Sequence, residues 1–187
     1  MHESSLALAP SSLVARRTAA VVLGAALVSV AAQIAIPLPG TPVPMTLQPL
    51  AVLLVGGLLG PALGASSMLL YLACGAAGLP VFTPYGLPGL ARLLGPTGGY
   101  LLAYPVAAFA VGKLAGDGRR LGPLALAVLA GLVLIHLGGL AQLLILTGNA
   151  DLAVRLGTLP FVVGDLFKLG IAVLVLKPTV SSLRARL

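Results

Sequence analysis

Long uncharged stretches, separated by short groups of glycine, proline and charged residues, make up most of this chain. Residues 18–36, 47–82 and 121–146 contain no Asp, Glu, Lys or Arg. A helix that crosses a bilayer needs about 20 largely apolar residues, because roughly 1.5 Å of rise per residue must cover about 30 Å of hydrocarbon. The pattern therefore predicts several membrane-spanning helices.

The stretch 47–82 is too long for one crossing, and Gly60-Pro61 interrupts it in the middle. Proline lacks an amide donor and crowds the preceding helical turn, so a break is expected there. We interpret the stretch as two short spans joined by a tight turn, which brings the total to six. The predicted spans are residues 18–36, two within 47–82, one that follows the glycines of 95–99 and ends near 116, 121–146 and 159–176, with a polar loop at 147–157.

The basic residues test this count, since short cytoplasmic loops carry an excess of Lys and Arg. Six spans with an inward N-terminus put eight basic residues inside and leave two, Arg92 and Arg155, outside. The inner set is Arg16, Arg17, Lys113, Arg119, Arg120, Lys177, Arg184 and Arg186. If 47–82 were one crossing, this set would be divided between the two sides, so the charges support the break.

We therefore predict an all-α integral membrane protein with six transmembrane helices and both termini in the cytoplasm. Residues 1–12 are expected to form an N-terminal tail, residues 13–178 the membrane domain and residues 179–187 a cytoplasmic C-terminal tail. A signal peptide is an alternative for the start of the chain, with small residues at 29–31 as the cleavage site. Its apolar stretch, however, is longer than the usual 7–15 residues or so.

Composition narrows the class of protein. Hydrophobic residues make up 59% of the 187 and charged residues 8%, whereas a soluble domain carries about 25% charge. A soluble fold is thus excluded. The net charge of +7 comes from basic residues scattered in ones and twos, which does not favour nucleic-acid binding. The single cysteine, Cys74, excludes an internal disulfide and is interpreted as a packing residue.

Two charged residues lie within the last predicted span. Asp165 and Lys168 are three positions apart, which places both side chains on one helix face. Charges in the hydrocarbon region are costly and for that reason informative. They form either a self-neutralising ion pair that only makes insertion tolerable, or a donor beside an acceptor for a neutral polar ligand in a cavity.

Further candidates lie near the ends of the spans. Arg92 could pair with a ligand carboxylate, or contact water or lipid head groups. The glycines that follow it, Gly98 among them, allow a close turn with amides aimed inward. Thr46 can cap the second span, while Gln48, as a buried amide, needs partners.

His136 and Gln142 lie in the fifth span. No second histidine or carboxylate is near them in the sequence, so an interhelical hydrogen bond is favoured over metal ligation.

Neither enzymatic catalysis nor nucleotide binding is indicated. No activated serine or cysteine beside a base is recognisable, and no Walker motif is present. If the chain takes part in ATP-driven transport, the ATPase must be another polypeptide. The first span carries small residues four apart, at Ala15/Ala19 and Ala20/Gly24, which can dock another helix or pack within the chain.

Four segments together resemble the BioY family, the biotin-binding S components of bacterial energy-coupling-factor (ECF) transporters. They are PVPMTLQ at 42–48, GLPVF at 78–82, GPTGGYL at 95–101 and GDLFK at 164–168, and the resemblance covers about residues 13–178. It implies a non-enzymatic subunit of the bacterial cell membrane that binds biotin in an outward-facing cavity and has no cofactor. The implied partners are a transmembrane coupling protein and two cytoplasmic ATPase subunits.

Residue by residue, the resemblance implies that Asp165 and Lys168 bind the ureido ring of biotin. Arg92, Gly98 and Gln48 would complete the pocket, and Ala15, Ala19, Ala20 and Gly24 would contact the coupling protein. The segment after Phe82 departs from the family pattern, because it contains two prolines and Tyr85. Tyr85 would stack on the bicyclic ring or close the opening. The remaining alternatives are an S component for another neutral heterocyclic vitamin and a membrane scaffold without a ligand.

Overall fold

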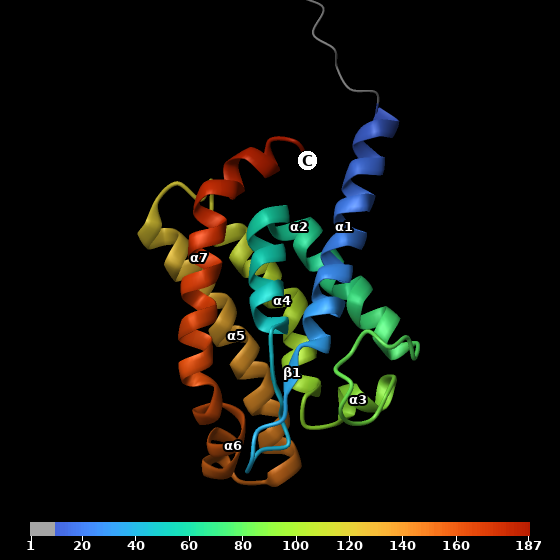
Figure 1. Cartoon of the computed structure of the whole chain (residues 1–187), viewed down its shortest axis with the longest axis vertical. Helices are drawn as coiled ribbons and strands as arrows, with labels where there is room; N and C mark the ends of the chain where they lie inside the picture. The colour runs from blue at the N-terminus through green and yellow to red at the C-terminus, as the bar shows by residue number, and fades with distance from the viewer. Residues whose placement is uncertain (1–9) are drawn as a thin grey trace, which may run out of the picture.

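The computed structural model describes residues 10–187, in which long helices lie side by side (Figure 1). Most of the predicted N-terminal tail, residues 1–9, lies outside the described residues. The elements are α1 (Pro10–Gln33), β1 (Ala35–Ile36), β2 (Met45–Thr46), α2 (Gln48–Ala76), α3 (Leu90–Leu94), α4 (Gly98–Leu114), α5 (Leu121–Thr147), α6 (Ala150–Gly157), the 3-10 turn η1 (Leu159–Phe161) and α7 (Val162–Arg184). Four helical stretches of the described residues are apolar and long enough to cross a membrane: α1, α2, α5 and the run from α6 through α7. The helix α4 is apolar but shorter.

The helix α2 is a hairpin of two helical halves. Gly60 has φ 80° and ψ 180°, a conformation that interrupts the helix and that glycine alone adopts readily. Beyond the break the chain turns back on itself, since a methyl group on Gly64 would meet the Cα of Gly56. Near the far end of the hairpin, the Gln48 side chain reaches the hydroxyl of Tyr71. The predicted break at Gly60-Pro61 is thus confirmed, and the described residues contain six long helical segments.

Glycines let the central helices approach one another backbone to backbone. A methyl group on Gly56 would collide with the Ala108 backbone of α4, and one on Gly99 of α4 would collide with the carbonyl of Gly138 in α5. In lipid, such small-residue contacts gain dispersion energy that larger side chains would prevent. α2, α4 and α5 therefore form a closely packed centre, with α1 against α2 and α7 against α2 and α5.

The structure differs from the sequence predictions in the connecting segments. The predicted polar loop at 147–157 contains the helix α6, because Asn149 caps it through the amide of Leu152 (3.0 Å) and Asp151 pairs with Arg155 one turn later (2.8 Å). Two short strands, β1 and β2, also pair antiparallel within a fold predicted to be all-α.

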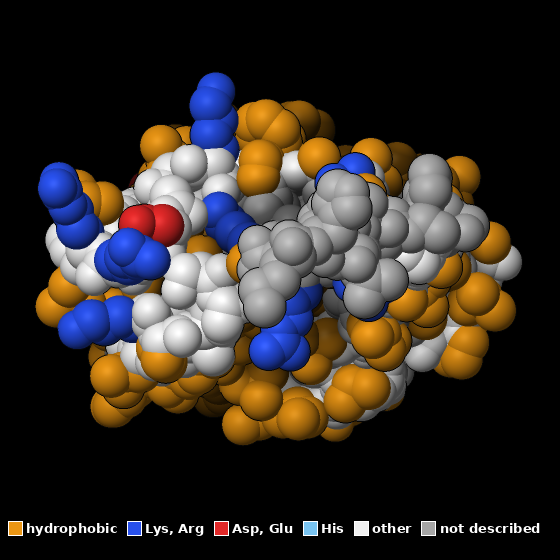
Figure 2. Space-filling view, turned by 90° about the horizontal axis from the view of Figure 1, so that it is seen from above, with side chains coloured by type: hydrophobic (Ala, Val, Ile, Leu, Met, Phe, Trp, Pro, Cys, Tyr) orange, Lys and Arg blue, Asp and Glu red, His pale blue; other side chains and the backbone are white. Residues whose placement is uncertain are grey.

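Basic residues gather at one end of the molecule. This end contains the start of α1, the α4–α5 connection and the end of α7, while α3 and α6 lie at the other end (Figure 1). Looking onto it, Figure 2 shows several Lys and Arg side chains over the face and hydrophobic side chains around the rim. Large apolar side chains such as Leu23, Leu126 and Leu174 are exposed on the helices, as expected for a surface in contact with lipid.

Arg184, in the last turn of α7, holds this basic end together. Its guanidinium donates to the carbonyls of Gly57 (Nε, 3.0 Å), Gly112 (Nη2, 3.0 Å) and Gly116 (Nη1, 2.7 Å). The Gly57 carbonyl would normally accept from the amide four residues on, but residue 61 is a proline and has no amide hydrogen. Arg184 supplies the missing donor. Residues 179–184, assigned to the C-terminal tail from the sequence, are a continuation of α7.

Candidate functional site

A cavity opens at the end of the molecule opposite to the basic end. Its empty space, with the open mouth included, is about 570 Å³. Side chains from the start of α2, from α3, α4, α5 and α7 and from the segment after α2 form its wall. The polar ones are Thr46, Gln48, Thr83, Arg92, Thr97, Tyr100, Tyr104, His136, Asp165 and Lys168.

Asp165 and Lys168 form a buried ion pair on the cavity side of α7. The Lys168 Nζ lies 2.9 Å from Asp165 Oδ1, and the two side chains are only 7% and 10% exposed for the lysine and the aspartate. Both residues line the cavity, as their spacing on one helix face predicted. The pair is therefore self-neutralising and faces a void at the same time, a geometry that fits either of the two interpretations from the sequence.

The second carboxylate oxygen of Asp165 is bound by α5. His136 Nε2 lies 2.6 Å from Asp165 Oδ2, and the other ring nitrogen is 3.5 Å from the hydroxyl of Thr158. The interhelical hydrogen bonds expected of His136 and Gln142 are both present, with Gln142 donating to the Leu94 carbonyl at 3.1 Å. The pairing of His136 with Asp165 was not predicted from the sequence.

Gln48 lies at the start of α2 with its amide fully engaged. It is 3% exposed, donates to Tyr71 Oη at 2.6 Å, and accepts from Thr46 Oγ1 at 3.2 Å. The Thr46 hydroxyl also accepts from the Gln48 backbone amide at 3.2 Å, but the N-cap residue of α2 is Leu47 and no side chain caps it, so the predicted cap at Thr46 is wrong. The requirement that a buried amide find partners is met inside the chain.

Arg92 is a buried arginine with an unused donor. It sits in α3, is 7% exposed and lines the cavity. Its Nη2 donates to the carbonyl of Thr83 at 2.8 Å, but among the buried side-chain nitrogens and oxygens of the described residues its Nε has no partner. A buried donor left unbonded costs free energy, so the guanidinium would gain from an acceptor that reached its Nε.

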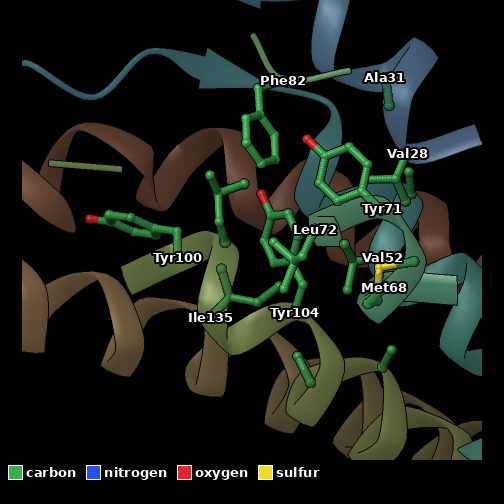
Figure 3. Packing of buried hydrophobic residues seen from close by; sticks show 14 of the residues in the cluster. Val28, Ala31, Val52, Met68, Tyr71, Leu72, Phe82, Tyr100, Tyr104 and Ile135 are labelled. Carbon is green, nitrogen blue, oxygen red and sulfur yellow. The ribbon is translucent and has the colours of Figure 1, made fainter. Parts of the chain in front are cut away.

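Aromatic side chains line the apolar part of the site. The rings of Tyr71 and Phe82 meet edge to face with centroids 5.4 Å apart, and Tyr104 stacks beside Tyr71 at 6.4 Å (Figure 3). Tyr100 faces His136 at 6.0 Å and is fixed by a 2.6 Å hydrogen bond to the Gly157 carbonyl. Flat apolar walls with a few fixed polar groups suit a compact ring system.

Not all candidate ligand residues reach the cavity. Gln48, Arg92, Asp165 and Lys168 line it, whereas Tyr85 and Gly98 are not part of its wall. Tyr85 is 48% exposed. Gly98 packs against the backbone of Leu93, where a methyl group would collide with the Leu93 carbonyl.

The small residues of α1 divide into two groups. Gly24 is buried against α2, since a methyl group there would lie 2.6 Å from Ser67 Oγ. Ala15 and Ala19 are exposed, and Ala20 is partly buried. Ala19, Ala20 and Gly24 line an apolar groove between α1, α2 and the C-terminal residues, with Arg16 and Arg186 at its edge.

Several site residues were missed from the sequence, notably His136, Tyr100, Tyr104 and Phe161. The sequence did contain a signal for His136. Asp165 is the one Asp or Glu in the predicted spans and His136 is the one histidine, and a buried carboxylate needs hydrogen-bond partners. The aromatic residues carried no comparable signal. In the described residues, no three His, Cys, Asp or Glu side chains come together as a metal site would require.

Comparisons with known proteins identify the family of the chain. The model of the BioY family matches residues 3–185. A probable biotin transporter BioY of Pyrococcus horikoshii is 43% identical over 161 residues, 86% of this chain and 94% of that protein. The biotin transporter BioY of Thermotoga maritima is 39% identical over 150 residues, 80% of this chain and 87% of that protein.

A solved structure has the same fold. The crystal structure of the S-component for biotin from an ECF-type ABC transporter superposes with a TM-score of 0.81 and covers 92% of this chain and 94% of that one, at 28% identity.

Proposed function

The chain belongs to the BioY family, and from this premise we propose that it is a biotin-binding S component of an ECF-type transporter. It is a substrate-binding membrane subunit, not an enzyme, and it needs no cofactor. The observation that carries the proposal is a cavity lined both by a buried acid–base pair and by a buried arginine whose Nε has no partner.

The polar groups of biotin match those of the cavity. The ureido ring offers two N–H donors and one carbonyl acceptor, and the valerate tail ends in a carboxylate. A carboxylate accepts about four hydrogen bonds, so Asp165 has capacity left after Lys168 and His136, and Lys168 keeps two protons for the ureido oxygen. The Arg92 guanidinium, which lines the same cavity, suits the valerate carboxylate, since charge-assisted hydrogen bonds are the strong ones.

Calorimetry on the detergent-purified chain tests the pocket. Biotin should bind the wild type, and Asp165→Asn and Lys168→Ala should each weaken binding by roughly 2–4 kcal/mol, because each leaves a buried charge unpaired. The matched control is Asp117→Asn, whose carboxylate is 63% exposed in the α4–α5 connection. Unchanged affinity in both pocket variants would refute the assignment. Absence of any bound vitamin would favour a scaffold, and displacement of biotin by another vitamin would favour that vitamin.

We further propose that all six helical segments cross the bilayer, with both termini in the cytoplasm of a bacterium. The concentration of Lys and Arg at one end supports this orientation. Single cysteines introduced at Ser182 and at Asn149, in a Cys74→Ala background, provide the test. A membrane-impermeant maleimide should label the Asn149 variant in intact cells, and the Ser182 variant only after permeabilisation. The reverse pattern would overturn the orientation.

The partners would be a transmembrane coupling protein and two cytoplasmic ATPase subunits. Because Gly24 is already packed against Ser67, we place the docking face at the exposed Ala15 and Ala19, with Ala20 beside them. Replacing both exposed alanines with leucine should reduce co-purification of the coupling protein and leave biotin affinity unchanged. Ala141→Leu, at an exposed alanine of α5, is the control. Retained co-purification would exclude this face.

A further inference from the structure

His136 connects α5 to the acid of the pocket, and nothing in the ligand chemistry above requires it. Its Nε2 lies 2.6 Å from Asp165 Oδ2, and its ring packs against those of Tyr100 and Phe161, with centroids 6.0 and 6.4 Å away. The side chain of His136 is 18% exposed and that of Asp165 is 10% exposed. A ring packed against two aromatic rings and bonded at one nitrogen has little freedom to turn.

The contact fixes which ring nitrogen carries hydrogen. A carboxylate is an acceptor only, so Nε2 must donate to Asp165. The ammonium of Lys168 already balances the charge of this carboxylate at 2.9 Å, and a second cation in the same buried group would be uncompensated. The neutral ring therefore has hydrogen on Nε2 and an acceptor at Nδ1, which faces the Thr158 hydroxyl at 3.5 Å.

We infer that His136 is a positioning residue for the ligand: Thr158 donates to its Nδ1, its Nε2–H holds one oxygen of Asp165, and Lys168 holds the other. Two donors from α5 and α7 thus fix the plane of the carboxylate. The remaining lone pairs of Asp165 are then directed at the N–H donors of a bound ring before the ligand arrives, which lowers the ordering cost of binding. This role rests on the proposed function, because the ligand it serves is biotin.

The binding test compares two substitutions of different shape. His136→Gln keeps a donor near the position of Nε2 and an acceptor for Thr158, while His136→Leu keeps neither. We expect biotin affinity to fall about 10- to 100-fold in the leucine variant and to recover most of that loss in the glutamine variant. Thermal unfolding in detergent is measured in parallel. Equal affinity of wild type and His136→Leu would overturn the inference, and so would a glutamine variant that keeps wild-type melting but binds as weakly as leucine.

A spectroscopic test addresses the hydrogen on the ring directly. The chain has two histidines, so ¹⁵N-histidine labelling gives two ring signals, and the spectrum of His136→Gln assigns them. The ¹⁵N shifts of His136 should report a neutral ring with hydrogen on Nε2, with and without biotin. Thr158→Val should weaken this preference, whereas Thr147→Val, the same change at a threonine bonded within α5 to the Leu143 carbonyl, should not. Hydrogen on Nδ1 in the wild type would refute the arrangement.

The two proposals can fail separately. If the wild type does not bind biotin, the proposed function fails, and the ¹⁵N shifts still decide whether the Thr158–His136–Asp165 chain exists. If the wild type binds biotin and the leucine variant binds equally well, the proposed function stands and the positioning role is wrong.

Discussion

The two ends of the molecule each engage an arginine, and they use it differently. At the basic end, Arg184 donates to three backbone carbonyls and joins α7 to the hairpin of α2 and to the end of α4. At the cavity end, Arg92 donates to one carbonyl and its Nε has no partner. All three guanidinium nitrogens of Arg184 donate to the chain and hold structure together, whereas the Arg92 guanidinium lines the cavity with one nitrogen still unbonded.

Of the variants at Arg92, Arg184 and Tyr85, the one at Arg92 should have the largest effect. Arg92→Ala should weaken biotin binding by about 2–4 kcal/mol, roughly 30- to 1,000-fold, because a ligand carboxylate would be buried without its cation. Calorimetry with biotin and with biotin amide measures this. Biotin amide should bind the wild type weakly, and its affinity should fall little further in Arg92→Ala, since it lacks the carboxylate that Arg92 recognises. Equal losses for both ligands would show that Arg92 does not bind the carboxylate.

An intermediate effect, on stability and not on binding, is expected at Arg184. Arg184→Ala leaves the Gly57, Gly112 and Gly116 carbonyls without their donor, so the free energy of unfolding should fall by about 1–3 kcal/mol. Thermal unfolding in detergent measures the loss, and biotin affinity of the folded fraction should not change. Arg184→Lys should recover only part of it, because an ammonium lacks the guanidinium fork. Arg186→Ala, at an exposed arginine two residues on, is the control.

The smallest effect is expected at Tyr85. Tyr85→Ala should change biotin affinity by no more than about 0.5 kcal/mol, since the side chain is 48% exposed and does not line the cavity. Phe82→Ala, which removes a buried ring from the cavity wall, should cost clearly more. A large loss at Tyr85 would indicate that the segment after Phe82 folds over the bound ligand.

Much of the fold could be predicted because membrane crossing depends on local properties. The apolar stretches, the Gly60-Pro61 break and the distribution of basic residues are all readable along the chain. The shared face of Asp165 and Lys168 follows from helix periodicity alone. The helix α6 was missed because its eight residues are too few for a membrane span, and its cap at Asn149 and the ion pair that follows do not show in the pattern of apolar stretches.

The unpredicted features are those that join residues far apart in sequence. His136 and Asp165 are 29 positions apart, and Arg184 and Gly57 are 127. Periodicity identifies which face of a helix is turned inward, but not which neighbour lies opposite. The small residues of α1 likewise look alike in the sequence. Only the packing shows that Gly24 lies against Ser67 while Ala15 and Ala19 are exposed.

The glycine contacts among α2, α4 and α5 also bear on how a molecule could leave the cavity. Helices that touch through their backbones cannot slide or spread without losing contacts that no side chain can replace by changing rotamer. The route in and out should therefore pass through the connecting segments at the mouth, where Thr83 and Arg92 lie, while the helical walls stay fixed.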